Sequence, residues 1–294
     1  MQKRIAILGA TSHIAKGLIP NFLQKMRSPL FLFARKPQDV ISFLQLNGRE
    51  LFPKILDFDK FGSNKYDIII NCVGLGTPNK VRSGNNEIFN LTEEFDNLVI
   101  EYLNKHRKTR YINLSSGAVY SVTCDDIKPE HYYGISKLYQ EAKHRSLNRL
   151  HIVDIRIFSY FSRFIDLNSG FFLTEIIKCI KLKKILETSS FDFIRDYLSP
   201  HDFFNLICLI IEKKPCNFVV DAYSAAPVRK FKLLEFFATK YALKYKIKDN
   251  LKLDSPTGRK DIYFSRSRKA LSLLGYKPEN SSLETIAAEI AHIL

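Results

Sequence analysis

Tyr133 and Lys137 stand four residues apart in the segment YYGISKLYQE and could together carry out proton transfer. This spacing places both side chains on one face of a helix. A tyrosine can then act as an acid or base, because the charge of a nearby lysine lowers the pKa of its phenol. On their own, a tyrosine and a lysine at this spacing are usually a coincidence on a helix surface, so the interpretation depends on their surroundings.

A serine pair lies upstream of the tyrosine. Ser115 and Ser116 close the apolar segment YINLSS, which has the composition of a buried strand. Open α/β sheets gather their ligands at the carboxyl ends of their strands, so we expect these hydroxyls to lie at a binding site. In this scheme Ser116 hydrogen-bonds the reacting oxygen, Tyr133 transfers the proton and Lys137 supplies the positive charge.

The elements that must position these residues alternate between strand and helix. Apolar runs predict strands near residues 4–8, 30–34, 51–56, 67–74, 110–115 and 152–158, and helical patterns follow near residues 37–47, 86–105 and 132–148. Nearly continuous apolar runs are typical of strands that are buried on both faces of a parallel sheet. The sequence therefore predicts the α/β class, as a doubly wound parallel sheet with right-handed crossovers.

The turn after the first strand, GATSHIA, has the spacing of a dinucleotide-binding turn but only one of its glycines. Gly9 supplies the sharp turn from strand to helix, and Ala15 is small enough for close packing of that helix. Ser12 stands where a second glycine usually lets the backbone approach a pyrophosphate. Its hydroxyl could cap the helix or hydrogen-bond a phosphate oxygen. Taken alone, the segment fits an ordinary turn equally well.

Together these features resemble the extended short-chain dehydrogenase/reductases, the family of NAD-dependent epimerases, dehydratases and reductases that modify nucleotide sugars. The likeness extends over nearly the whole chain. It also rests on the segments NCVGL (71–75), NLT (90–92), SSGAVYS (115–121), RIFSYF (156–161), RDYLSPHDF (195–203) and SRSRKALSLLGYKPENSSLETI (265–286). The chain departs from the family pattern at Ser12 and at Ser159, where the family has asparagine.

The resemblance implies a Rossmann-type NAD(P)-binding domain over residues 1–158. Residues 159–294 would form mainly a smaller substrate-binding lobe, with some segments returning to the first domain. The implied catalytic residues are Ser116, Tyr133 and Lys137. The implied cofactor contacts are Gly9, Thr11, Ser12, His13, Ile14, Arg35, Lys36, Asp57, Val73, Gly74, Tyr133 and Lys137, and the implied substrate contacts are Ser116, Ser159, Arg195 and Arg259. The two arginines would bind the diphosphate of a nucleotide sugar, and His13 could equally face solvent.

The end of the second strand usually decides between NAD and NADP. The strand LFLFA is followed by Arg35 and Lys36, with no acid before Asp39. An arginine suits the 2′-phosphate of NADP, whereas an acid would accept the ribose hydroxyls of NAD. We therefore favour NADPH, with NAD as the alternative. Asp57, after the third strand, would lie near the adenine.

The residues after Ser116 limit the reaction. The 4,6-dehydratases of the family have an Asp-Glu pair there, and this chain has Gly117 and Ala118, neither of which can transfer a proton. We favour an NADPH-dependent reductase of a nucleotide-linked keto-sugar, in which Tyr133 protonates the oxygen. An NAD-dependent nucleotide-sugar 4-epimerase stays open, as does a non-catalytic NADP-binding sensor. Retention of serine, tyrosine and lysine argues against the sensor.

Composition sets the remaining expectations. The chain has 294 residues and a net charge of +15, from 45 basic and 30 acidic residues. Short basic clusters, RKTR (107–110) and KLKK (181–184), are expected to be solvated faces. No apolar run reaches the roughly 20 residues of a membrane span. The five cysteines form no CxxC pair and the seven histidines no metal-binding pattern. We expect a cytoplasmic enzyme without metal, nucleic-acid or membrane partners, with a homodimer as one option.

Overall fold

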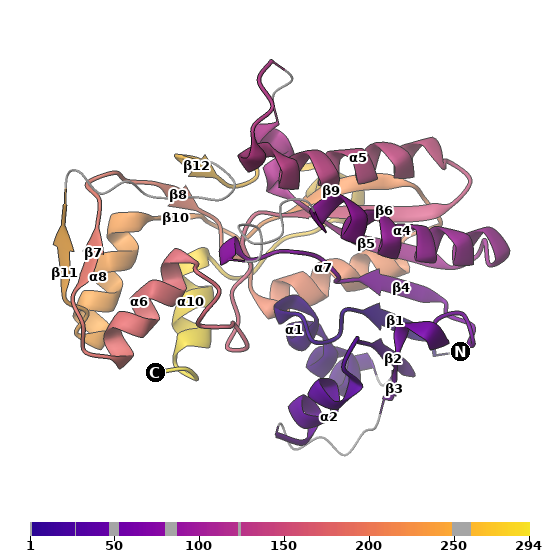
Figure 1. Cartoon of the computed structure of the whole chain (residues 1–294), viewed down its shortest axis with the longest axis horizontal. Helices are drawn as coiled ribbons and strands as arrows, with labels where there is room; N and C mark the ends of the chain where they lie inside the picture. Colours follow the sequence, from indigo (N-terminus) through magenta and orange to yellow (C-terminus); the bar gives the residue numbers. More distant parts are fainter. Residues whose placement is uncertain (1, 27, 47–52, 80–86, 123–124, 249–259) are drawn as a thin grey trace.

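The computed structural model describes residues 2–26, 28–46, 53–79, 87–122, 125–248 and 260–294. Its largest sheet has seven strands in the order β3-β2-β1-β4-β5-β6-β9, and every pairing between them is parallel. The strands are β1 (Ile5–Leu8), β2 (Leu30–Phe33), β3 (Lys54–Leu56), β4 (Ile68–Asn71), β5 (Arg110–Ser116), β6 (His151–Ile157) and β9 (Phe218–Ala222). This order, with helices on both faces, confirms the predicted fold class (Figure 1).

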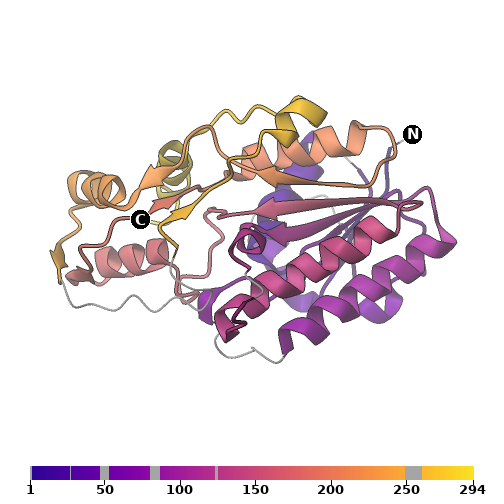
Figure 2. The same ribbon diagram turned by 90° about the horizontal axis from the view of Figure 1, so that it is seen from above.

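The two faces of this sheet carry different helices. One face packs against α1 (His13–Asn21), α2 (Pro37–Leu46) and α7 (Pro200–Glu212), through a large aliphatic core. The other face carries α4 (Glu87–Lys105) and α5 (Tyr132–Ser146), which lie side by side in Figures 1 and 2. The connection between β3 and β4 holds only the 3-10 turn Phe58–Lys60, so the strict alternation expected from the sequence is interrupted there.

Helix α5 buries a different kind of side chain from helix α4. Helix α4 has an apolar stripe, which is typical of a helix that packs on a sheet. The buried residues of α5 are instead glycine and polar or charged side chains, namely Gly134, Ser136, Lys137, Gln140, Glu141 and His144. These side chains find polar partners on β5, β6 and α4, which a pattern of apolar residues cannot reveal.

The C-terminal lobe packs around a core of its own. It contains α6 (Phe172–Lys181), β7 (Leu186–Thr188), β8 (Ile194–Arg195), β10 (Val228–Arg229), α8 (Lys230–Tyr241), β11 (Tyr245–Ile247), β12 (Ile262–Tyr263) and α10 (Ser282–Ile290). Two small sheets, β10-β8-β12 and β11-β7, frame this lobe. Its helices α6, α8 and α10 bury leucine, isoleucine and phenylalanine side chains against one another.

The chain passes between the two lobes more than once. After β8 it returns to the large sheet through α7 and β9, and β9 pairs in parallel with β6. Helix α9 (Lys269–Leu274) then packs near β9 before the chain enters α10. Across the described residues, no helix has the length and apolar character that crossing a bilayer requires.

Candidate active site

Strand β5 ends in two serines, which lie at the carboxyl edge of the sheet and have different surroundings. The Ser115 hydroxyl donates to Glu141 Oε1 at 2.5 Å and is therefore committed to a buried structural contact. Ser116 Oγ accepts a bond from the Ala118 backbone N–H at 3.1 Å, which caps the 3-10 turn Gly117–Ser121. This cap fixes the Ser116 oxygen while its proton remains able to point at a ligand.

Tyr133 lies in the first turn of α5, against Ser116. Burial raises the pKa of the Tyr133 phenol, and a hydrogen bond with Ser116 partly opposes that rise. The helix can approach because residue 134 is glycine: a Cβ on Gly134 would lie 2.7 Å from the Ala118 carbonyl oxygen. The fold thus brings together the serine and tyrosine that the sequence singled out, and Gly134 is a contribution that sequence reasoning missed.

Lys137 lies one turn further along α5 and is only 4% exposed. Its ammonium donates to the Leu114 carbonyl oxygen at 3.0 Å and lies 3.4 Å from Gln140 Oε1. Burial lowers the pKa of Lys137, and the nearby carboxylates oppose that shift. Burial is the dominant cause at the Tyr133 phenol, and the Lys137 ammonium donates to the end of β5, so the lowering of the Tyr133 pKa by Lys137 stays a prediction.

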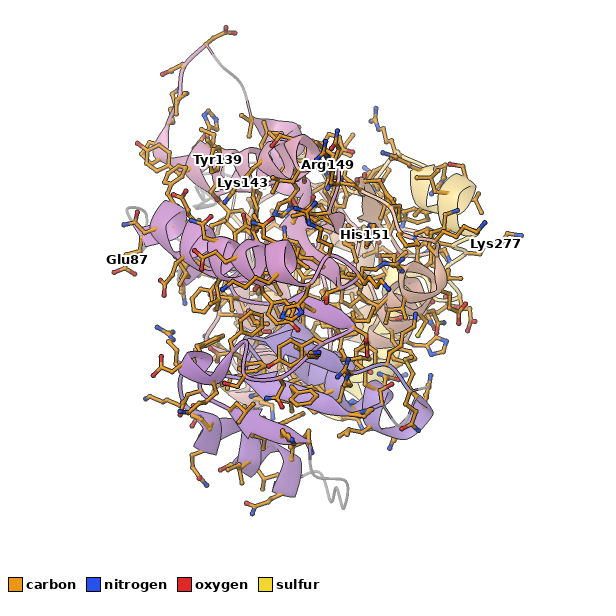
Figure 3. The ribbon with its side chains drawn as sticks, turned by 90° about the vertical axis from the view of Figure 1, so that its right-hand side faces the viewer. Glu87, Tyr139, Lys143, Arg149, His151 and Lys277 are labelled. Carbon is orange, nitrogen blue, oxygen red and sulfur yellow. The ribbon has the colours of Figure 1, made fainter. Side chains whose placement is uncertain are left out.

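A buried ionic network continues from Lys137 along the same face of α5. His144 is fully buried, with Nε2 2.7 Å from Asp96 Oδ1 and Nδ1 2.8 Å from Asp154 Oδ1. Both ring nitrogens face carboxylates, and only the imidazolium can donate to both. Burial alone would lower the pKa of His144, but Asp154 and Asp96 outweigh it and raise the pKa to about 9. Lys143, labelled in Figure 3, and Arg145 complete the network at its rim.

A second tyrosine, which sequence reasoning missed, reaches Ser116 from the other lobe. The Tyr263 hydroxyl on β12 lies 3.2 Å from Ser116 Oγ. Burial raises the pKa of Tyr263 well above its usual range. Ser116 therefore has Tyr133 on one side and Tyr263 on the other. No motif marks residue 263, because its place is set by the contact between two lobes.

The residue after Ser116 has no room for a side chain. A Cβ on Gly117 would lie 2.4 Å from the ring of Phe158, at the end of β6. The Phe158 ring also packs against Tyr263, with centroids 5.2 Å apart. An aromatic ring thus fills the space that a side chain at residue 117 would need, and the exclusion of a 4,6-dehydratase stays a prediction.

The turn after β1 has the shape needed for a dinucleotide. Gly9 adopts a φ of +72°, and a Cβ there would lie 2.9 Å from the backbone of Cys72 and Val73. Ser12 Oγ accepts from the Ala15 N–H at 3.2 Å, so the hydroxyl caps α1, one of its two predicted roles. The N-terminus of α1 faces the carboxyl edge of the sheet, where its free N–H groups suit a phosphate.

His13, also in this turn, packs edge-on against Tyr160, with ring centroids 5.0 Å apart. Burial lowers the pKa of His13 to about 4, so the ring is neutral at physiological pH. The structure thus argues against the solvent-facing alternative. Gly17 accommodates Tyr160, because a Cβ on Gly17 would overlap the phenol. Thr11 is exposed and Ile14 is half-buried beside them.

The other predicted cofactor residues lie at neighbouring strand ends. Arg35 and Lys36 are exposed just after β2, and Asp57 is exposed just after β3. Val73 and Gly74 follow β4, where the Val73 N–H donates to Asn71 Oδ1 at 3.0 Å. The fold thus gathers these residues along one edge of the sheet, and their contacts with a cofactor stay a prediction.

Arg195, the predicted diphosphate ligand, lies on β8 in register with Tyr263 on β12. Its guanidinium carbon is 4.5 Å from the centroid of Phe193 and 5.7 Å from that of Tyr263. The neighbouring Asp196 accepts instead from the Ser224 backbone N–H at 3.1 Å. Arg195 therefore lies beside Tyr263, whose hydroxyl contacts Ser116.

The remaining predicted substrate residues are less informative. Ser159 is half-buried at the end of β6, where its carbonyl oxygen accepts from the Leu198 N–H at 3.0 Å. Arg259 falls outside the described residues. Within the described part of the chain, histidine, cysteine and acidic side chains form no group of three or more that could hold a metal ion.

The fold and site define a nicotinamide-dependent enzyme of the short-chain dehydrogenase/reductase type: a parallel sheet with a glycine turn after β1 and Ser116, Tyr133 and Lys137 at its carboxyl edge. The sequence matches the NAD dependent epimerase/dehydratase family over residues 5–221. The chain belongs to this family, which confirms the resemblance. No curated protein matches the sequence.

Solved structures share this fold over their whole length. UDP-glucuronic acid 4-epimerase from Bacillus cereus, in complex with UDP-glucuronic acid and NAD, has a TM-score of 0.80, 18% identity and coverage of 99% of this chain and 98% of that one. UDP-glucose 4-epimerase from Bifidobacterium longum, in complex with NAD+ and UDP, has a TM-score of 0.77, 18% identity and coverage of 98% and 97%. ADP-L-glycero-D-manno-heptose-6-epimerase from Helicobacter pylori has a TM-score of 0.80, 12% identity and coverage of 99% and 96%.

Proposed function

We propose that the chain is a nucleotide-sugar epimerase that inverts one sugar carbon through a transient ketone. The observation that carries this proposal is similarity over both lobes, substrate-binding lobe included, to epimerases solved with NAD and UDP or a UDP-sugar. The reductase that the sequence favoured becomes the second candidate. The sensor becomes a distant third, because Ser116 and Tyr133 lie together in a site that can transfer a proton.

The described residues suit the proton transfers that an epimerase needs. Ser116 hydrogen-bonds the reacting sugar oxygen, with its own oxygen fixed by the Ala118 N–H. Tyr133 takes the proton of the sugar hydroxyl as the carbon is oxidised, and returns it when the carbon is reduced from the other face. The Lys137 ammonium holds positive charge beside the strand end. A bound nicotinamide supplies the hydride chemistry, and the turn at Gly9 and the edge at Val73 would hold it.

Arg35 supports the second candidate, an NADPH-dependent keto-sugar reductase. It is exposed directly after β2, where a guanidinium can pair with the 2′-phosphate of NADP. An epimerase returns its hydride in each cycle and needs no cofactor from solution, whereas a reductase consumes NADPH stoichiometrically.

Measuring whether the purified protein consumes NADPH distinguishes the epimerase from the reductase. An epimerase should convert a UDP-linked sugar without net change in absorbance at the NADPH band, and a reductase should consume NADPH with a 4-keto-sugar nucleotide. Arg35→Asp should weaken binding of NADPH far more than binding of NADH. Conversion that requires added NADPH in stoichiometric amounts would reject the epimerase.

Arg195 provides a test of substrate placement. Charge-assisted bonds from arginine to phosphate are worth roughly 1.5–3 kcal/mol each. Arg195→Ala should raise the Michaelis constant for the nucleotide sugar about tenfold or more. The dissociation constant of the cofactor should barely change, since the cofactor would lie on the large sheet. A variant that lost the cofactor instead would show that the diphosphate lies elsewhere.

We further infer a cytoplasmic homodimer formed through α4 and α5. The cytoplasm fits the four free cysteines within the described residues. The two helices expose Phe89 at 38%, Leu138 at 40% and Tyr139 at 54%, which are large apolar side chains on one surface. Sedimentation of the wild type and of Leu138→Glu tests the dimer, which should dissociate in the variant.

A further inference from the structure

The far end of the C-terminal lobe combines exposed lysines with exposed apolar side chains. We call residues 181–188 and 244–248 the lysine tip. Its lysines are all exposed: Lys181, Lys183, Lys184, Lys244, Lys246 and Lys248. Among them stand Leu182, 61% exposed, Ile185, 58% exposed, Tyr245, 39% exposed, and Ile247, 45% exposed. A solvated face, as expected for KLKK (181–184), explains the lysines but not the apolar side chains.

Strand pairing creates this surface from two distant segments. Strand β11 pairs in parallel with β7, with Tyr245 opposite Leu186 and Ile247 opposite Thr188. The Leu186 N–H donates to the Lys244 carbonyl oxygen at 2.9 Å, which fixes the start of the pairing. Figures 1 and 2 both show β7 and β11 at the end of the lobe that is remote from the large sheet. The tip is thus a protruding part of the molecule.

The charge of the tip is strongly one-sided. Its two segments hold six lysines and one acidic residue, Glu187, for a net charge of +5. Glu187 pairs with Lys248 at 2.6 Å. Lysines on an exposed edge strand can serve merely to prevent strand addition. That explanation does not extend to Leu182 and Ile185, which precede β7 and are more than half exposed.

We propose that the lysine tip docks the protein peripherally on an anionic lipid bilayer. Long lysine side chains can reach lipid headgroups, while the leucine, isoleucine and tyrosine side chains enter the boundary with the acyl chains. A second copy of this chain fits poorly, because two such tips would oppose like charges. A nucleic acid needs phosphate contacts but no exposed aliphatic side chains.

This contact is compatible with the rest of the molecule. The expectation of no membrane partner rested on the absence of a spanning run, and a peripheral contact requires none. Strands β8 and β12, which carry Arg195 and Tyr263, lie between the tip and the large sheet in Figure 1. Docking at the tip therefore leaves the catalytic side chains away from the lipid surface.

Sedimentation of the full chain with vesicles tests the proposal. The protein should bind vesicles of phosphatidylcholine mixed with phosphatidylglycerol and not vesicles of phosphatidylcholine alone, and added salt should weaken the binding. Lys181→Glu with Lys183→Glu and Lys184→Glu should reduce the partition coefficient at least about tenfold, since each surface lysine contributes measurably. Thermal melts would confirm that the variants fold, and their turnover of soluble substrate should equal that of the wild type.

The basic cluster at the opposite end of the molecule offers a charge-matched control. Lys105, Arg107 and Lys108 are exposed just before β5, on the side that Figure 3 faces and where it labels His151. Replacing all three with glutamate changes the net charge equally and should alter vesicle binding less than about twofold if the tip is responsible. Equal losses in both triple variants would overturn the proposal, because binding would then follow net charge alone.

Variants of the exposed apolar side chains distinguish binding to a membrane from binding to another polyanion. Leu182→Ser with Ile185→Ser leaves the charge unchanged and should weaken vesicle binding about tenfold through lost apolar burial. Binding that this variant retains in full would contradict the proposal. Binding of a single-stranded oligonucleotide with the same affinity as the mixed vesicles, and with the same loss in the lysine variant, would identify a nucleic-acid surface instead and equally reject the membrane.

Discussion

Helices α7 and α5 pack on opposite faces of the same sheet in opposite ways. Helix α7 buries an almost wholly apolar stripe, with Phe203, Phe204, Leu206, Ile207, Ile210 and Ile211 against the strands. Helix α5 buries lysine, glutamine, glutamate and histidine side chains over a similar length. The packing of α7 thus gains stability from apolar burial, whereas the packing of α5 depends on paired charges that are costly to leave alone.

The two helices therefore contribute differently to the molecule. A lysine can stay charged inside a protein only where carboxylates or carbonyl oxygens compensate for lost water. Around Lys137 these groups are Leu114 O, Asp96, Asp154 and Glu141. The polar face of α5 therefore supplies the environment that the buried Lys137 needs, whereas α7 buries no lysine.

The largest expected effect separates catalysis from folding. Tyr133→Phe should lower turnover about a thousandfold, because it removes the proton-transfer group, while leaving the free energy of unfolding nearly unchanged. Tyr139→Phe on the same helix, at an exposed position, is the matched control and should keep full turnover. Turnover that survives in the Tyr133 variant would show that another group transfers the proton, with Tyr263 the first to test.

The next effect compares the two ways of packing. Asp154→Ala should destabilise the fold by about 3–5 kcal/mol, because it removes a carboxylate partner from the buried His144 and from Arg145. Ile207→Ala on α7 should cost about 2–5 kcal/mol through its cavity. Denaturant unfolding measures both.

An exposed ion pair provides the control for Asp154→Ala. Asp126→Ala removes the exposed partner of Lys128 and should change the free energy of unfolding by less than about 1 kcal/mol. An Asp154→Ala loss no larger than that of Asp126→Ala would mean that the network beneath α5 contributes little.

The smallest expected effect is a dependence of the free energy of unfolding on pH, which arises from His144 on α5 and has no counterpart among the apolar side chains of α7. The folded pKa of His144, about 9, lies above the unfolded value of 6.5. Its stabilisation is complete below about pH 6.5 and is lost as the pH rises through 9, by about 3 kcal/mol. The lowered pKa of Asp96 acts at the other end of the scale, since its contribution is lost only in acid. Unfolding of wild type and His144→Gln across this range should show the decline in wild type alone; an identical decline in both would assign it elsewhere.

The sequence by itself determined the order of the first six strands of the large sheet and the identity of the chemical groups. Its apolar runs located these six strands but not β9, because strands buried on both faces are continuously apolar. Gly9, Ser116, Tyr133 and Lys137 could be singled out because each stands at a fixed distance from a strand end or a helix neighbour. Local spacing is enough for such groups, since regular backbone geometry fixes where they point.

Only the tertiary structure decided how distant segments meet. Tyr263 reaches Ser116 across 147 residues of chain, and Phe158 fills the space beside Gly117. The polar face of α5 is a second example: the sequence shows His144 and Asp154 as ordinary charged residues, and their burial appears only when α4 and β6 enclose them. Contacts of this kind depend on packing between elements, where no periodicity in the chain records which side chains will share a volume.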